Sequence, residues 1–410
     1  MVLSVSRLAL GLALGAGAVF SAVPAGAHSG GTVQAAPNFT EAEYRALAAV
    51  ETALSARNYA AAASALSSAQ GAVRGADARY FLATLQLRHA RETGNVAAQA
   101  AAIDTLVASG RIGGADLAPL YAAQGATSAT AGKREQAEAA LTRALALTPN
   151  ADTAISLARI KLDLRKNAEA VTLIQQAIDL RRAAGQPVPQ GWYRRGASVA
   201  TMSNLGPQAI RFARELVAAY PTPVNWRDAL LTYRDYAKPD QAGQLDTMRL
   251  LRLSKGLAGE RDYLEASQTF DTAGLSGESR SVLDEGVSTR TIDPAKASFK
   301  EAIATSVRKA AAEKSKLSAL QASAMAATTG APALQAGDMF LGAANYPAAI
   351  DLFQAAVRKG GVDPNVASTR LGIALALAGR KAEAEAAFRA VAAPRADLAA
   401  LWLVWLSQRA

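Results

Sequence analysis

The sequence predicts an all-α protein, a solenoid of about ten stacked helix pairs that ends in a capping helix. Two stretches agree in register, residues 131–145 (AGKREQAEAALTRAL) and residues 378–391 (AGRKAEAEAAFRAV). In both, a glycine is followed five residues later by an alanine and, four residues after that, by a large apolar side chain. The same small-residue position recurs at intervals of 33, 39 and 35 residues, and twice at an interval of 70 residues, which is two repeats. Such a period is typical of helix-turn-helix repeats.

The first segment, residues 1–27, has the pattern of a secretory signal peptide. A single positive charge at Arg7 precedes an apolar run, and Ala25-Gly26-Ala27 supplies the small residues that signal peptidase requires. We therefore predict cleavage after Ala27, a flexible leader over residues 28–39, and a periplasmic or secreted protein. Because the residue after the cleavage point is His28 and the chain has no cysteine, we expect that it is not a lipoprotein.

Residues 40–115 are predicted to form divergent helix pairs, and their high alanine content leaves the repeat register ambiguous. In front of them, Thr40 is predicted to cap the first helix, with Phe39 making an apolar contact. We prefer this interpretation of Asn38-Phe39-Thr40 to glycosylation of Asn38.

The clearer repeats lie in residues 116–293 and 331–393. Small residues are required where two helices cross closely, and a large apolar residue fills the joint between them. Gly132 and Gly379 are predicted to end first helices and to turn the chain. We assign the repeat positions to Gly125, Ala137, Leu141, Ala209, Gly337, Ala349, Phe353, Gly372, Ala384 and Phe388.

This spacing resembles the tetratricopeptide repeat, a helix-turn-helix unit of about 34 residues with the pattern W-x2-L-G-x2-Y, then A-x3-F, then P. The resemblance implies a right-handed superhelix in which the first helices of the pairs line a concave groove. It also implies a protein that binds other proteins and catalyses no reaction.

Two segments depart from the repeat. Residues 294–330 have no glycine or proline between Pro294 and Gly330, which leaves open one long helix or two poorly marked repeat helices. Residues 394–410 are predicted to form a capping helix, in which Trp402 and Trp405 share an apolar face. Capping is the preferred interpretation of this face, and contact with a membrane or with a partner is the alternative.

Composition restricts the chemistry. With two histidines and no cysteine, a Ser-His-Asp triad, a cysteine nucleophile and a histidine-rich metal site are disfavoured, so we predict no enzyme, no metal and no cofactor. Ser306-Val307-Arg308-Lys309 matches an S-x-x-K motif, but the companion motifs S-D-N and K-T-G are absent. The net charge of +10 suits acidic proteins, anionic glycans or lipid head groups, and no motif for nucleic-acid recognition accompanies it.

The candidate binding groove lies on the first helices of the central repeats. Arginine and aromatic side chains there have the composition of a binding hot spot. Trp226 and Tyr233 are seven residues apart and share one helix face, which is either a groove surface or part of the core. The groove assignment comprises Trp192, Arg194, Ser198, Thr201, Trp226, Tyr233, Tyr236, Arg261 and Gln268.

Together these patterns favour a non-catalytic scaffold of the cell envelope that holds an acidic or extended segment of another envelope protein. One alternative is an accessory factor of exopolysaccharide or outer-membrane export that binds an anionic glycan. Another alternative is a peripheral protein of the membrane surface, for which membrane contact is not the expected outcome.

Overall fold

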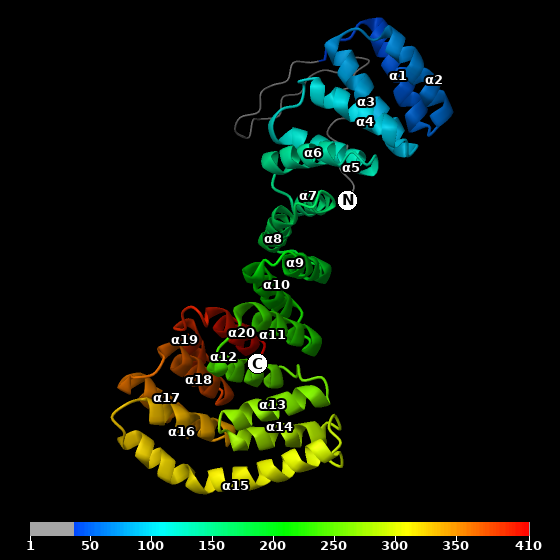
Figure 1. Ribbon diagram of the computed structural model, residues 1–410. Helices are drawn as coiled ribbons and strands as arrows, with labels where there is room; N and C mark the ends of the chain where they lie inside the picture. Colours follow the sequence, from blue (N-terminus) through cyan, green and yellow to red (C-terminus); the bar gives the residue numbers. More distant parts are fainter. Residues whose placement is uncertain (1–36, 410) are drawn as a thin grey trace, which may run out of the picture. The chain divides into compact units, whose positions relative to one another are not determined.

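The computed structural model describes residues 37–409, and the part it describes is entirely α-helical (Figure 1). The predicted signal peptide and most of the predicted leader therefore lie outside the described residues. The helices form two compact units, which divide after Lys166 and are described separately below. In each unit, consecutive helices pack as antiparallel neighbours in the manner of a tetratricopeptide-like solenoid.

Unit 1 consists of short helix pairs followed by a single helix. Its pairs are α1 with α2, α3 with α4, and α5 with α6, and α7 packs on α6. The elements are α1 (Glu41–Ser55), α2 (Tyr59–Ala72), α3 (Ala76–Glu92), α4 (Val96–Ala108), the short 3₁₀ helix η3 (Gly114–Leu117), α5 (Ala118–Thr130), α6 (Arg134–Leu147) and α7 (Ala151–Asp163).

Unit 2 begins with α8 and continues to the last described helix. Most of its helices pack in pairs, and α8, α15 and α20 stand outside the pairs. The elements are α8 (Asn167–Ala183), α9 (Gln190–Met202), α10 (Gly206–Ala219), α11 (Pro223–Ala237), α12 (Gln241–Leu253), α13 (Glu260–Thr272), α14 (Ser276–Ser288), α15 (Ala297–Ala326), α16 (Ala331–Gly342), α17 (Tyr346–Lys359), α18 (Pro364–Leu377), α19 (Lys381–Arg389) and α20 (Ala396–Ser407).

Close helix crossings depend on glycines that face a large side chain sixteen residues later. A Cβ on Gly372 would lie 2.6 Å from the Phe388 ring, and one on Gly337 would lie 2.5 Å from the Phe353 ring. Gly125 stands in the same relation to Leu141, at 2.5 Å. These distances are shorter than any carbon–carbon contact can be, so only glycine allows the two helices to approach this closely.

The small residues of the second helices are also buried. The fully buried residues at this position are Ala137, Ala209, Ala349 and Ala384. In the pair α13–α14, serines replace glycine and alanine, and the hydroxyls of Ser267 and Ser279 form a buried hydrogen bond of 2.9 Å. A close crossing can therefore be kept without an apolar pair when the two polar groups satisfy each other.

Helix ends follow the local sequence. Thr40 is the N-cap of α1 and forms a capping box with Glu43, and the Phe39 ring lies edge-on to Phe81 at 5.1 Å. Both features confirm the prediction for Asn38-Phe39-Thr40. Gly132 and Gly379 have φ values of 74° and 77°, a left-handed conformation that favours glycine after a helix.

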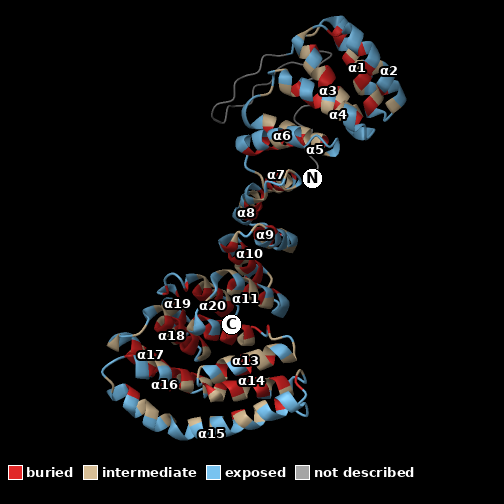
Figure 2. Cartoon of the chain, in the orientation of Figure 1, coloured by how far each residue is buried: buried red, intermediate tan, exposed pale blue. Residues whose placement is uncertain are grey.

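The segment 294–330 contains one long helix, α15, with 30 residues. Only Phe299, Ser306 and Ala324 are buried along it, so most of its surface is open (Figure 2). Of the two alternatives left by the sequence, the structure has the single long helix.

Unit 2 folds back so that its last helix packs on its early ones. α20 contacts α10 and α12, and the Trp402 ring stacks on Phe388 at 5.8 Å. Arg214 of α10 pairs with Asp397 at 3.0 Å, and the Gln408 side-chain amide donates to the Val217 carbonyl at 2.8 Å. Trp402 and Trp405 are almost completely buried. They cover the end of the core, and their burial excludes the alternative that these two indoles contact a membrane.

Candidate functional site: two faces of the first helices in unit 2

The first helices of the central pairs, α9, α11 and α13, each place three side chains at i, i+4 and i+7 on one face. Such spacing aligns side chains along one side of a helix. We call this set the central face. It comprises Arg194, Ser198 and Thr201 of α9, Arg227, Leu231 and Arg234 of α11, and Arg261, Glu265 and Gln268 of α13.

Contacts between neighbouring helices hold the central face together. Arg194 donates to the Asn225 side-chain oxygen at 3.2 Å, which joins α9 to α11. Arg227 forms an ion pair with Asp262, and Arg234 forms one with Glu265 at 2.9 Å, which join α11 to α13. The central face is therefore a fixed surface of three helices and not a set of independent side chains.

Five of the residues predicted for the groove lie on the central face. Arg194, Ser198, Thr201, Arg261 and Gln268 are all exposed there. Trp192 is partly buried beside it, with the Arg181 guanidinium 5.4 Å from the centre of its indole ring. Tyr236 is also partly buried, and its hydroxyl donates to the Thr201 carbonyl at 3.0 Å.

Trp226 and Tyr233 belong to the core, which corrects their assignment to the groove. Their exposed fractions are 3% and 1%, and the Trp226 indole N–H donates to the Gln408 side chain at 3.2 Å. Burial raises the pKa of Tyr233 to about 12. The surface stripe of α11 lies one residue further along, at Arg227 and Arg234. Because one residue turns a helix by 100°, the prediction selected the neighbouring stripe.

The central face contains a small hollow. Its volume is ≈ 220 Å³, and it is lined by Arg227, Leu231, Arg234, Met248, Leu251, Arg261, Asp262 and Glu265. Burial alone would raise the pKa of Asp262, but hydrogen bonds from Arg227 and from the Ala258 amide outweigh it and lower that pKa. The carboxylate therefore stays charged and neutralises Arg227. Arg261 also lines the hollow, and it has no acidic partner among the described residues.

The first helices of the C-terminal pairs, α16 and α18, are covered by other helices of unit 2. α12 packs against α18, and α14 packs against α16. Asp338 of α16 and Arg370 of α18 are 5% and 7% exposed, although they stand on the helices that line the groove in tetratricopeptide repeats. The chain itself therefore fills this second face.

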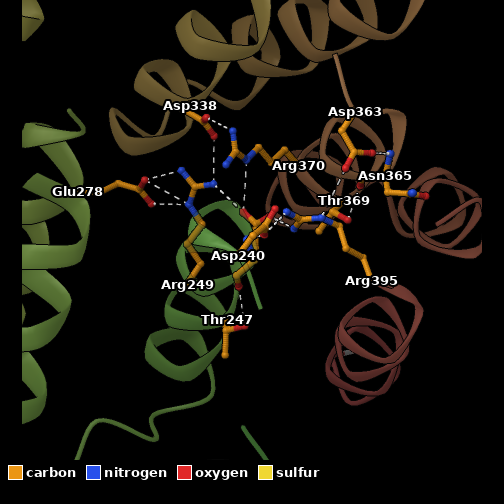
Figure 3. Close-up of polar contacts among 12 residues, drawn as sticks. Asp240, Thr247, Arg249, Glu278, Asp338, Asp363, Asn365, Thr369, Arg370 and Arg395 are labelled. Atoms are coloured by element: carbon orange, nitrogen blue, oxygen red, sulfur yellow. Dashed lines mark hydrogen bonds and ion pairs between the residues drawn. The ribbon is translucent and has the colours of Figure 1, made fainter. Parts of the chain in front are cut away.

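A network of six buried charges occupies the covered face (Figure 3). Arg249 of α12 donates to Glu278 at 3.0 Å and to Asp338 at 3.0 Å, and Arg370 also donates to Asp338. Three of the buried groups are carboxylates and three are guanidiniums, and Arg395 also pairs with the more exposed Asp240 at 2.5 Å. Its members are Asp246, Glu278, Asp338, Arg249, Arg370 and Arg395.

The network depends on every member being present. Burial by itself lowers the pKa of Arg249, but the carboxylates of Glu278 and Asp338 outweigh it and raise that pKa above its ordinary value. Asp246 is fully buried, and burial raises its pKa against the opposing charges of Arg370 and Arg249. Removal of one charge would leave an opposite charge buried without compensation, which is strongly unfavourable.

This network was not predicted from the sequence. α12 has the sequence QAGQLDTMRLLRL, in which Asp246 and Arg249 stand among apolar residues. Charged residues inside an apolar run are a signal of buried pairing, because an unpaired charge would disrupt such a core. Their partners on other segments lie 29 to 149 residues away in the sequence, and no local pattern identifies them.

A second hollow lies elsewhere in unit 2, between α8 and α10. Its volume is ≈ 620 Å³, and Val171, Leu180 and Phe212 contribute apolar surface to it. Arg211 at its edge pairs with Glu215 at 2.9 Å and with Asp179 at 3.7 Å. This hollow has a larger volume than the hollow of the central face. Its charged side chains already form ion pairs with one another.

The described residues hold no cluster of three or more metal-ligating side chains. Within the S-x-x-K stretch, Ser306 is fully buried and its hydroxyl donates to the Ile303 carbonyl at 2.9 Å, while Lys309 is exposed and pairs with Asp271. The serine is thus neither accessible nor in contact with the lysine. Along residues 37–409, none of the helices has both the length and the apolar character needed to cross a bilayer.

Residues 334–399 match the family model described as tetratricopeptide repeat. This segment of the chain is thus similar to tetratricopeptide repeats. The match spans α16 to the start of α20, the region in which Gly337 and Gly372 make their close crossings. Proteins built from these repeats are generally non-catalytic scaffolds for protein–protein interaction.

The solved structures that match the chain share little sequence with it. MamA protein is 13% identical with a TM-score of 0.31, and the match covers 47% of this chain and 92% of MamA. A tetratricopeptide repeat protein from Parabacteroides merdae is 14% identical with a TM-score of 0.26, and the match covers 70% and 98%. The TPR2AB domain of yeast Sti1 in complex with an HSP90 peptide is 13% identical with a TM-score of 0.24, and the match covers 72% and 100%. A comparison with curated protein sequences gave no significant match.

Proposed function

We propose that the protein is a non-catalytic scaffold of the cell envelope whose central face holds an extended segment of another protein. The observation that carries this proposal is the contrast between the two faces of unit 2. The central face is exposed, whereas the covered face is filled by α12 and α14. Among the first helices of this unit, α9, α11 and α13 thus offer the surface on which a partner can lie.

The charges of the central face favour an extended segment over a strongly acidic one. Arg227 and Arg234 are already paired with Asp262 and Glu265, so the face has few free cations. Ser198, Thr201 and Gln268 are exposed and can bond to a peptide backbone. Arg194 and Arg261 can bind carboxylate or carbonyl oxygens of the same segment. The same shortage of free cations argues against a polyanionic glycan as the ligand.

Site-specific crosslinking tests the proposal. A photoreactive residue at Ser198 or at Gln268 of the full-length protein should attach the same partner in cells, because both positions are exposed on the central face. A photoreactive residue at Thr172, exposed on α8, is the matched control and should not attach it. The double charge reversal R194E and R261E should reduce the yield. Equal yields from Thr172 and from the central face would contradict the proposal.

The location in the cell envelope is a separate part of the proposal and rests on residues 1–27. N-terminal sequencing of the protein purified from a host that exports it should begin at His28, with the protein in the periplasmic or secreted fraction. An intact N-terminus in the cytoplasmic fraction would contradict export and would leave the proposal for the central face unaffected.

A further inference from the structure

The long helix α15 carries a large share of the positive charge of the chain. It contains five basic and two acidic residues, and thus supplies three of the ten net positive charges of the protein. α15 has 30 residues, which corresponds to a length of about 45 Å. This excess of positive charge is therefore concentrated along one helix and not spread over the surface.

Most of this charge is free. Lys300, Arg308, Lys314 and Lys316 are exposed, and among residues 37–409 none of them has an acidic side chain at ion-pair distance. Elsewhere in unit 2, most arginines have such a partner, as Arg227 and Arg234 show. Unpaired like charges on one helix repel one another, which destabilises the free protein slightly and favours an anionic partner.

Three contacts hold α15 in place on unit 2. Phe299 is buried near its start. In its middle, the Glu313 carboxylate accepts from the Ser276 and Gly277 amides at 2.7 and 3.3 Å, at the first turn of α14. At its end, the Lys359 ammonium donates to the carbonyls of Ala324, Met325 and Ala327. A partner would thus meet a preformed surface, without the entropic cost of ordering it.

The side chains between the free charges are small. Ala304, Ala311, Ser315, Ser318 and Ser323 are exposed on the same helix, and the large exposed apolar side chains are limited to Val307 and Met325. Peripheral membrane helices need an apolar face with several large side chains, which α15 lacks. Its one aromatic side chain, Phe299, is buried, so α15 also offers no exposed ring on which a nucleic-acid base could stack.

We propose that the exposed side of α15 is a docking surface for an acidic segment of a partner protein. Carboxylates of the partner would pair with Lys300, Arg308 and Lys314 along the length of the helix. This surface differs from the central face in residues and in chemistry, because two of the four arginines of the central face are neutralised by acidic partners. The inference is thus independent of the proposed function.

The test uses two matched triple charge reversals in the full-length protein. The first is K300E, R308E and K314E on α15. The second is R91E, R134E and R159E, three exposed arginines of unit 1 that likewise lack an acidic partner within the described part of the chain. Both variants change the net charge equally, so that any difference between them reports the position of the charges and not their sum.

Binding is measured by anisotropy with a fluorescent polyglutamate peptide, and by flotation with phosphatidylglycerol vesicles. We expect the α15 variant to bind the peptide about tenfold or more weakly than the wild type, and the control variant within about twofold. Equal weakening in both variants would overturn the proposal, because binding would then follow net charge alone. Binding to vesicles that the α15 variant loses, without binding to the peptide, would also overturn it in favour of a membrane surface.

A second readout locates the contact directly. Because the chain has no cysteine, a single cysteine can carry a fluorophore at a chosen position. A label at Ser315 of α15 should respond to polyglutamate, whereas one at Ser64, exposed on α2, should not. Equal responses at the two positions would contradict the proposal even if both triple variants fold.

Discussion

The first helices of the C-terminal repeats and those of the central repeats differ in what covers them. α16 and α18 belong to the segment that matches the tetratricopeptide family, yet their faces are filled by α12 and α14 of the same unit. α9, α11 and α13 lie outside that match, and their face is open. In this protein, the repeats that agree best with the family pattern therefore stabilise the fold, and the divergent ones remain available for a partner.

The largest expected effect concerns the buried network of the covered face. Replacement of Arg249 by Met removes the cation that lies between Glu278 and Asp338 and leaves buried carboxylates without compensation. We expect a loss of about 3–5 kcal/mol in the free energy of unfolding, measured in urea. The matched change on the central face, R234M, breaks a partly exposed pair and should cost about 1 kcal/mol or less. Similar losses in both variants would show that the charges of the covered face are no more important for stability than those of the central face.

A medium effect is expected at the close crossings. Replacement of Gly372 by Ala would place a Cβ 2.6 Å from the Phe388 ring, which forces the two helices apart. The expected cost is about 1–3 kcal/mol. Gly191, in the first turn of α9, has no atom within 4 Å of such a Cβ, so that G191A should be neutral or slightly stabilising. Thermal unfolding of the two variants checks the prediction, and a G372A protein as stable as the wild type would refute the role of the glycine.

The smallest effect concerns pH. The pKa of Asp262 is lowered in the folded protein, so its contacts with Arg227 and the Ala258 amide stabilise the fold above the ordinary aspartate pKa. This contribution is lost as the pH falls below about 4. D262N should therefore be less stable than the wild type at neutral pH, and the difference should shrink as the solution is acidified. A difference that is independent of pH would mean that the carboxylate charge has no part in it.

The repeat itself could be predicted from the sequence. The interval of sixteen residues from Gly337 to Phe353 and from Gly372 to Phe388 lies within a single helix pair, and close crossing requires that combination of small and large side chains. Thr40 with Glu43 and the glycines at positive φ are local in the same sense. Such features depend on a few neighbouring residues, which is why the sequence identifies them.

The stripes of surface residues were harder to predict. On α9 and α13, the predicted residues Arg194, Ser198, Thr201, Arg261 and Gln268 are exposed. On α11, Trp226 and Tyr233 are assigned to the groove for their aromatic character, but both are buried. Arg227 and Arg234 form the surface of this helix instead. Aromatic residues at helical spacing suit a core and a binding surface equally well, so composition alone could not decide between the two stripes.

By itself, the sequence determined the helix-turn-helix repeat, the positions of its small residues and the caps of its helices, because each of these rests on contacts within one helix pair. Only the tertiary structure decided which face stays open. That choice depends on Arg249 meeting Asp338, and on Asp246 meeting Arg370 and Arg395, from segments far apart in the chain. Charges can be buried only where opposite charges surround them, and that condition is met by the folded unit as a whole and by no single repeat.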